Sequence, residues 1–219
     1  MVLNLLLGLD LLTLRYLNNK RLELKETNDY QLKLGYKDNF LYKRPLVVDM
    51  KITPHILVCG LSNSGKTKMI EFAIKNKNVV LLNVYQDDFK AVNCQRINGK
   101  DSILEFLNSL LILKFQKLPL YIVIDELLTL CIDKRIVEAI TNLLAIGKHL
   151  NVFIIGISQQ GTKESVKFKD LFNVRVCFRQ VEESSYRAVL GYSPQDTHLV
   201  HREFYLYSDY IEKGYTYTI

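Results

Sequence analysis

Residues 60–67 read Gly-Leu-Ser-Asn-Ser-Gly-Lys-Thr, which is the full G-x-x-x-x-G-K-T pattern of a phosphate-binding loop. An apolar run at residues 55–59 precedes the loop, and a helical pattern follows it. In that context the backbone N–H groups of the loop and the N-terminus of the helix can surround phosphate oxygens. Lys66 is expected to reach the β- and γ-phosphates of ATP, and the Thr67 hydroxyl to bind Mg²⁺. The predicted nucleotide-binding residues are Gly60, Leu61, Ser62, Asn63, Ser64, Gly65, Lys66 and Thr67.

A second chemical motif is the pair Asp125-Glu126, which ends the apolar run at residues 120–124. Asp125 is expected to hold Mg²⁺, directly or through water. Glu126 is expected to polarise the attacking water as a general base. The alternative is that the two acids only favour the start of a following helix. The phosphate loop upstream favours the catalytic interpretation, with Lys66 and Glu126 as catalytic residues.

Gln159 follows a further apolar run at residues 152–157. An amide at such a strand end can contact the γ-phosphate or the attacking water, so Gln159 is the third predicted catalytic residue. A glutamine in a solvated loop is the open alternative. Phosphoryl-transfer enzymes also gain rate from a cation that a neighbouring subunit supplies. The candidates for this trans-acting role, each equally compatible with an exposed structural position, are Lys148, Arg175, Arg179 and Arg187.

The elements that must position these residues alternate between buried strands and helices, which predicts an α/β fold with a mostly parallel sheet and helices on both faces. Ligands of such sheets bind at the carboxyl ends of the strands. The expected helices include residues 66–75, 134–150 and one from the capping box Ser102-x-x-Glu105 through Phe115. The expected strands are residues 30–36, 45–49, 55–59, 79–82, 120–124, 152–157, 174–178 and one or two in the aromatic tail.

The chain has 219 residues, enough for one well-packed α/β domain. Hydrophobic residues make up 48% and charged residues 24%, which is typical of a globular protein and excludes a disordered one. We expect a leucine-rich and polar extension at residues 1–44 and the nucleotide-binding domain at residues 45–219. The formal charge of +6 is compatible with a polyanionic partner without identifying one.

The four cysteines form no C-x-x-C pair, and neither they nor the histidines have metal-ligand spacing. We therefore expect no disulfide framework, no structural zinc and a cytoplasmic location. The segment Met1–Leu17 lacks the features of a signal peptide, and Asp10 and Arg15 interrupt it before the length of a membrane span is reached. It is expected to pack on the core or on a neighbouring subunit. Its alternative is a helix that docks on a membrane surface or a partner.

Several segments resemble, in the same order, the motor domain of FtsK/SpoIIIE-type DNA translocases. The similarity covers about residues 32–207. The most specific segment is the Pro54-His55 approach to the phosphate loop. The remaining segments are Pro45–Met50, Ile122–Leu127, Gly147–Gln159, Asn173–Phe178 and Ser185–Gly191. The resemblance implies a RecA-like motor ATPase with a catalytic glutamate, usually hexameric, that pumps double-stranded DNA through a central pore.

Members of the wider FtsK–HerA group serve chromosome segregation, conjugative transfer and viral genome packaging. This sequence departs from the family pattern at Lys148, where many members carry arginine, and at Gln160, which replaces an arginine. It also has no multi-span anchor or winged-helix domain, so a bare motor is expected. The segment Gly161–Lys169, with Lys163 and Lys167, is the expected DNA-facing loop, an ordinary solvated loop being the alternative.

The leading hypothesis is an ATP-hydrolysing, Mg²⁺-dependent translocase that moves double-stranded DNA for a plasmid, an integrative element or a phage. It would work as a homo-hexamer. A viral genome-packaging ATPase is the alternative, with the N-terminal segment docking on a capsid or on a membrane complex. A non-motor ATP-binding switch or scaffold is the third hypothesis. The expected location is the cytoplasm, or the periphery of a membrane or virion complex.

Overall fold

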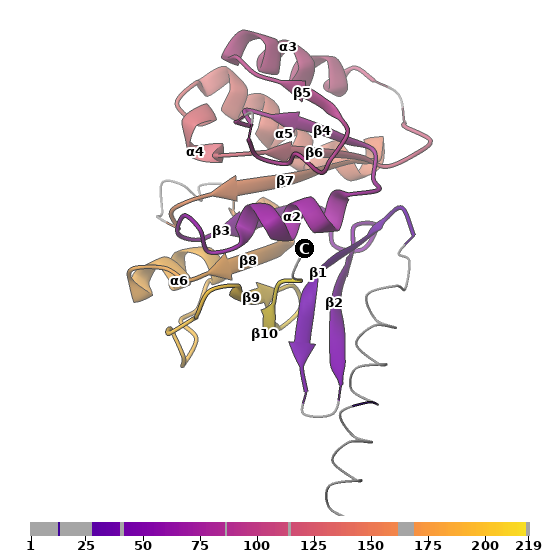
Figure 1. Cartoon of the computed structure of the whole chain (residues 1–219). Coiled ribbons are helices and arrows are strands. Elements are labelled where there is room, and N and C mark those ends of the chain that lie inside the picture. The colour runs from indigo at the N-terminus through magenta and orange to yellow at the C-terminus, as the bar shows by residue number, and fades with distance from the viewer. Residues whose placement is uncertain are drawn as a thin grey trace, which may run out of the picture.

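The computed structural model describes Thr13 and residues 28–39, 42–85, 87–113, 115–161 and 169–217. Within these residues the strands form one ten-stranded mixed sheet in the order β2-β1-β10-β9-β8-β3-β7-β6-β4-β5 (Figure 1). From β8 to β5 all neighbours are parallel, and from β2 to β8 all are antiparallel. The sheet therefore has two halves of different construction.

The parallel half contains the apolar runs of the sequence. Its central strands are buried on both faces, which is why they read as continuous hydrophobic segments rather than as alternating ones. In this half, β3 lies between β7 and β8, and β7 separates β3 from β6. The strands are β3 (Ile56–Cys59), β4 (Val79–Leu82), β5 (Gln95–Ile97), β6 (Leu120–Ile124), β7 (Val152–Ser158) and β8 (Val174–Phe178).

The antiparallel half joins the two ends of the described chain. The strand predicted at residues 30–36 overlaps β1, and the aromatic tail provides the two closing strands β9 and β10. Residue 44, where we expected the extension to end, falls inside β2. The strands of this half are β1 (Gln31–Asp38), β2 (Lys43–Asp49), β9 (Glu203–Tyr207) and β10 (Ile211–Tyr215).

Two apolar cores lie on opposite faces of the sheet. Helices α3, α4, α5 and α6 cover one face, while α2 and strand β1 cover the other. The prediction of an α/β fold with a mostly parallel sheet and helices on both faces is thus confirmed. The helices are α2 (Lys66–Ile74), α3 (Lys100–Leu111), α4 (Leu127–Leu130), α5 (Lys134–Leu150) and α6 (Glu183–Leu190), and a 3₁₀ turn η1 spans Lys169–Leu171.

Helix α3 differs from its prediction at both ends. It begins after Gly99, whose φ of 91° suits glycine, and no side chain caps it, so the expected capping box at Ser102 is wrong. The helix also ends before the predicted Phe115. Packing explains the difference, because the buried face sets the extent of the helix and stops where the chain becomes exposed. That buried face consists of Ile103, Leu107 and Leu110.

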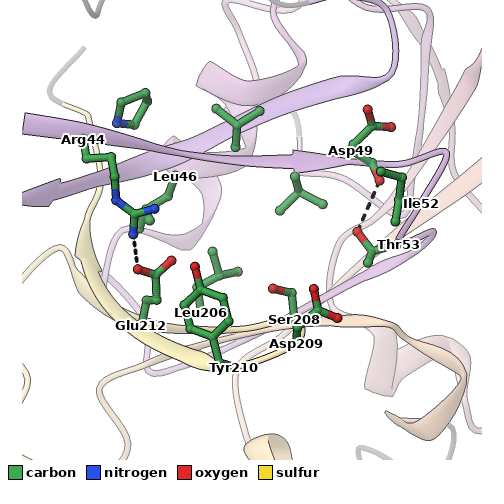
Figure 2. A pocket seen from close by; sticks show the side chains of 13 residues that line it. Arg44, Leu46, Asp49, Ile52, Thr53, Leu206, Ser208, Asp209, Tyr210 and Glu212 are labelled. Carbon is green, nitrogen blue, oxygen red and sulfur yellow. Dashed lines mark hydrogen bonds and ion pairs between the residues drawn. The ribbon is translucent and has the colours of Figure 1, made fainter.

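A groove of about 320 Å³ separates strand β2 from the turn between β9 and β10 (Figure 2). At one end Arg44 forms an ion pair with Glu212, and at the other the Thr53 hydroxyl donates to the backbone carbonyl of Asp49 at 3.2 Å. No residue of the phosphate loop lines this groove. The groove is therefore formed by the antiparallel strands and is separate from the phosphate loop.

Candidate nucleotide-binding site

The predicted phosphate loop connects β3 to α2 at the carboxyl edge of the parallel strands. Both neighbouring strands fix its first residues. The Gly60 N–H donates to the Ser158 carbonyl of β7 at 3.2 Å, and the Leu61 N–H donates to the Arg179 carbonyl beyond β8 at 3.1 Å. The loop therefore starts from a defined position between two strand ends.

The two glycines of the pattern have separate structural reasons. A Cβ at Gly60 would lie 2.5 Å from the Cβ of Phe178, so a side chain there would displace β8. Gly65 has a φ of 112°, a conformation that residues with a side chain rarely adopt. Gly65 directly precedes α2, which leaves the first N–H groups of that helix at the loop.

Lys66 folds back over the loop. Its Nζ donates to the carbonyls of Gly60 at 2.6 Å and Leu61 at 2.8 Å, and the residue is 7% exposed. Burial lowers the pKa of Lys66, while the carboxylates of Glu126 and Asp125 act in the opposite direction. The ammonium group is thus held at the loop between carbonyl oxygens and acids.

The residues present fit a bound triphosphate. The Ser64 hydroxyl is buried and has no hydrogen-bond partner, which suits a group that receives one from a ligand. A cavity of about 440 Å³ opens beside the loop, and its lining includes Lys66 and Thr67. Among the described residues, no three His, Cys, Asp or Glu side chains form a metal-binding group. A Mg²⁺ ion would therefore depend on Thr67, Asp125, water and phosphate oxygens, as is usual for this ion.

Asp125 and Glu126 follow the end of β6. Burial, together with the smaller effect of the nearby charges of Asp88 and Glu126, raises the pKa of Asp125 to about 6, and Lys66 opposes this rise. Burial also raises the pKa of Glu126, and hydrogen bonds from Gln159 oppose this shift. Glu126 has a left-handed backbone with φ of 52°, an uncommon conformation that is often found at functional sites.

Gln159 connects the loop to these acids. It follows β7, is exposed, and accepts a hydrogen bond from the Ser62 hydroxyl through Oε1 at 3.2 Å. Its backbone and its side chain also hydrogen-bond to the carboxylate of Glu126. The three predicted elements of the site are therefore in one place, although about a hundred residues separate Ser62 from Gln159 in the chain.

The four trans-acting candidates lie in different environments. The guanidinium of Arg175 contacts Asp170 at 3.2 Å and lies over the ring of Tyr207 at 5.1 Å, with a side chain 12% exposed. These contacts within its own subunit argue against a trans-acting role. Arg179 is exposed beside the chain's own loop, and Arg187 donates to Ser193 at 3.3 Å.

Lys148 is exposed near the end of α5, which leads into the start of β7. It therefore lies at the amino edge of the sheet, opposite to the chain's own phosphate loop.

The expected DNA-facing loop is described only at its ends, Gly161 and Lys169, and Lys163 and Lys167 lie outside the described residues. Lys169 donates to the carbonyl of Ala188 at 2.8 Å. Residues 1–12 and 14–27, with most of the leucine-rich segment, also lie outside the described residues. In the part of the chain that is described, no helix has the length and apolar character of a membrane span.

The sequence prediction missed two parts of the site. Asp88 lines the cavity beside the loop and acts electrostatically on Asp125, although the sequence prediction named no site residue in this part of the chain. Its signal was the pair Asp87-Asp88 shortly after a buried strand. Arg202, which precedes β9, lines the same cavity, and nothing in the local sequence marks it.

Comparison with known proteins finds no matching family model and no matching curated protein. Solved structures do match. The pCW3 conjugation coupling protein TcpA, with ATPγS, has a TM-score of 0.72 at 16% identity over 88% of this chain and 67% of its own. The type VII secretion ATPase EccC of Thermomonospora curvata has a TM-score of 0.68 at 17% identity over 88% of this chain and 29% of its own.

A third match is the genome packaging NTPase B204 of Sulfolobus turreted icosahedral virus 2, in complex with ATPγS. Its TM-score is 0.57 at 13% identity, over 75% of this chain and 98% of its own. The chain thus shares the fold of FtsK/SpoIIIE-type ATPases, and the structural match predicted from the Pro54-His55 approach and the ordered motifs is confirmed.

Proposed function

We propose that this chain hydrolyses ATP and uses the energy to move double-stranded DNA for a mobile genetic element. The observation that carries the first half is that Gln159 hydrogen-bonds to both the phosphate loop and the carboxylate of Glu126. This arrangement joins the binding of a γ-phosphate to the base that would activate water. Such coupling is what an ATPase needs and what a simple nucleotide-binding protein does not.

In this proposal the loop N–H groups and Lys66 bind the β- and γ-phosphates. Water attacks the γ-phosphorus, the bond to the bridging oxygen breaks, and Glu126 accepts the proton of the water. Because burial raises the pKa of Glu126, its carboxylate is a stronger base than an exposed one. Mg²⁺, held by Thr67 and Asp125, would neutralise part of the charge on the phosphates. Gln159 positions the water and loses a partner when the γ-phosphate leaves.

The second half, DNA movement, is supported by the proteins that share the fold. One is described as a conjugation coupling protein and another as a genome packaging NTPase. The formal charge of +6 suits a polyanionic partner. Lys148, at the sheet edge opposite the loop, supports an assembly in which one subunit completes the site of the next. We propose a homo-hexameric ring.

ATPase measurements with and without long duplex DNA test this function. We expect duplex DNA to stimulate hydrolysis several-fold at low salt and less at high salt, because contacts to phosphates release counterions. The control is Lys66→Ala, which should show no hydrolysis in either condition. Hydrolysis that is indifferent to DNA at low salt would refute the DNA half and leave the ATPase half standing.

A packaging ATPase is the second candidate function. The observation that favours it is that the chain covers 98% of the packaging NTPase but 67% of the coupling protein. Such a motor is expected to be inactive on free DNA and to hydrolyse ATP when empty capsids are added. Because secretion ATPases share the fold, stimulation by a peptide instead of DNA would point to a protein substrate.

A non-motor switch or scaffold, docked through the N-terminal segment, is the third candidate. A scaffold would keep its biological role in the Glu126→Gln variant, which is expected to bind ATP without hydrolysing it. Complete loss of DNA transfer in that variant would exclude a scaffold.

A further inference from the structure

The segment before β9 packs on the phosphate loop. The Arg202 N–H donates to the Ser64 carbonyl at 3.1 Å, and the Arg202 carbonyl accepts from Thr216 N–H at 3.0 Å. The Cα and Cγ of Arg202 lie 3.6 Å from the position that a Cβ on Gly65 would take. The base of the Arg202 side chain is therefore held directly against the last turn of the loop.

The backbone of Arg202 is strained. Its φ is 71°, in the left-handed region where glycine is favoured and a long side chain is uncommon. A residue that keeps an unfavourable conformation beside a binding loop indicates that its side chain has a use there. The guanidinium of Arg202 does not stabilise the described part of the chain, because it forms no hydrogen bond or ion pair with any described residue.

The charges of the cavity leave Arg202 available to an anion. The cavity contains three acids, of which Glu71 pairs with Lys68 at 2.7 Å and Asp87 pairs with Lys90 at 2.7 Å. The third, Asp88, acts electrostatically on Asp125. Lys66 and Arg202 remain as the cations of the cavity that form no ion pair with a described acid, although Asp125 and Glu126 act electrostatically on Lys66.

The direction of the cavity identifies the phosphate. Beyond Thr67 its lining continues along α2 to Lys68 and Glu71, and it includes neither Glu126 nor Gln159. Since the γ-phosphate must lie beside those two residues, the cavity receives the opposite end of the triphosphate. We propose that Arg202 is a nucleotide-binding residue whose guanidinium binds the α-phosphate of the bound nucleotide, an assignment that rests on the proposed ATP site.

Equilibrium binding of fluorescent AMP, ADP and ATPγS to the full chain tests this assignment. Arg202→Ala is expected to weaken all three nucleotides by a similar factor of about tenfold or more, because a charge-assisted hydrogen bond to a shared phosphate is lost. Arg202→Lys should retain part of the affinity, since a lysine keeps the charge but not the fork of donors. Arg135→Ala, which removes an exposed arginine of α5, is the matched control and should bind like the wild type.

Arg202→Gly separates binding from folding. Glycine relieves the left-handed backbone, so this variant is expected to melt at or above the temperature of the wild type while losing the same affinity. Unchanged AMP affinity in Arg202→Ala and Arg202→Gly would overturn the assignment, as would a loss confined to ATPγS. A wild-type chain that binds no nucleotide would overturn the proposed ATP site as well, so the two failures are distinguishable.

Discussion

The two edges of the parallel sheet differ in the hydrogen-bond partners and pKa values of their buried polar side chains. At the carboxyl edge, the Ser64 hydroxyl is buried without a partner and burial raises the pKa values of Asp125 and Glu126. At the amino edge, the Ile154 N–H donates to Nδ1 of buried His55 at 3.0 Å, and the Asn151 amide donates to the Gln116 carbonyl at 2.9 Å. Although Nε2 of His55 at the amino edge is also buried without a partner, the hydrogen bonds of His55 Nδ1 and Asn151 there join separate elements, whereas the carboxyl edge keeps groups available to a ligand.

Both edges carry motifs that resemble the FtsK/SpoIIIE pattern, so a shared motif does not by itself mark chemistry. The Pro54-His55 approach and the segment around Gly147 meet at the amino edge, where a Cβ on Gly147 would lie 3.1 Å from the His55 ring. The pair joins the start of β3 to the turn between α5 and β7. We infer that the contact between His55 and Gly147 is architectural, while the loop, Asp125-Glu126 and Gln159 serve the reaction.

The largest effect is expected at the carboxyl edge from Glu126→Gln. Removing a general base should lower kcat by about 10²–10⁴-fold. Because glutamine keeps the shape of the side chain, the affinity for ATPγS and the melting temperature should change little. Single-turnover hydrolysis and equilibrium binding measure the two quantities separately. Near-normal hydrolysis by Glu126→Gln would contradict the assignment of the reaction to the carboxyl edge.

The next effect concerns pH at the amino edge. Burial lowers the pKa of His55 to about 4, against an ordinary value of 6.5, with a smaller opposing effect from the carbonyl of Leu144. Between these two pKa values the unfolded chain binds a proton at His55 that the folded chain does not bind. The contribution of His55 to the free energy of unfolding is therefore complete above pH 6.5 and decreases by about 3 kcal/mol as the pH falls toward 4.

The variant His55→Asn isolates this contribution. Asparagine offers an acceptor to the Ile154 N–H and tolerates the positive φ of 65° at this position. It does not titrate, so its free energy of unfolding should fall less between pH 7 and pH 4 than that of the wild type. Denaturant unfolding at several pH values measures the difference. Parallel curves for the two proteins would mean that His55 takes up its proton without unfolding.

A smaller loss of stability is expected from Gly147→Ala. The new Cβ would lie 2.6 Å from the Val152 carbonyl, so α5 must shift relative to β7. Overpacking of this kind costs about 1–3 kcal/mol. Denaturant unfolding checks the value, and Ala145→Gly on the exposed face of α5 is the control for helix propensity. Nucleotide affinity of the folded variant should be unchanged, since the loop lies at the other edge.

The sequence was sufficient wherever a local pattern and the tertiary structure agree. Buried parallel strands appear as apolar runs, and the loop and Asp125-Glu126 stand at their ends, so fold and motifs were predictable. Contacts between distant segments were not. The start of α3 depends on packing, Arg175 is engaged by Asp170 and Tyr207, and Arg202 reaches the loop only because β9 pairs with β8. None of these has a signal in its own neighbourhood of the chain.

The smallest effect, Gln159→Ala, distinguishes a reacting group from a packed one within the carboxyl edge. Gln159 is exposed, so its loss should leave the melting temperature unchanged. Its side-chain hydrogen bond lowers the pKa of Glu126, and without it that pKa rises. A higher pKa moves the acid limb of the pH–rate profile to higher pH, because Glu126 must be ionised to accept a proton. We expect a loss of about tenfold in kcat at neutral pH, the scale of one hydrogen bond.

Ser62→Ala is the control, because it removes the hydrogen bond between Ser62 and Gln159 and leaves the one between Gln159 and Glu126 in place. This variant should reduce kcat without moving the acid limb of the pH–rate profile. If the acid limb of the pH–rate profile does not shift in Gln159→Ala, Gln159 has an architectural role rather than a role in the reaction.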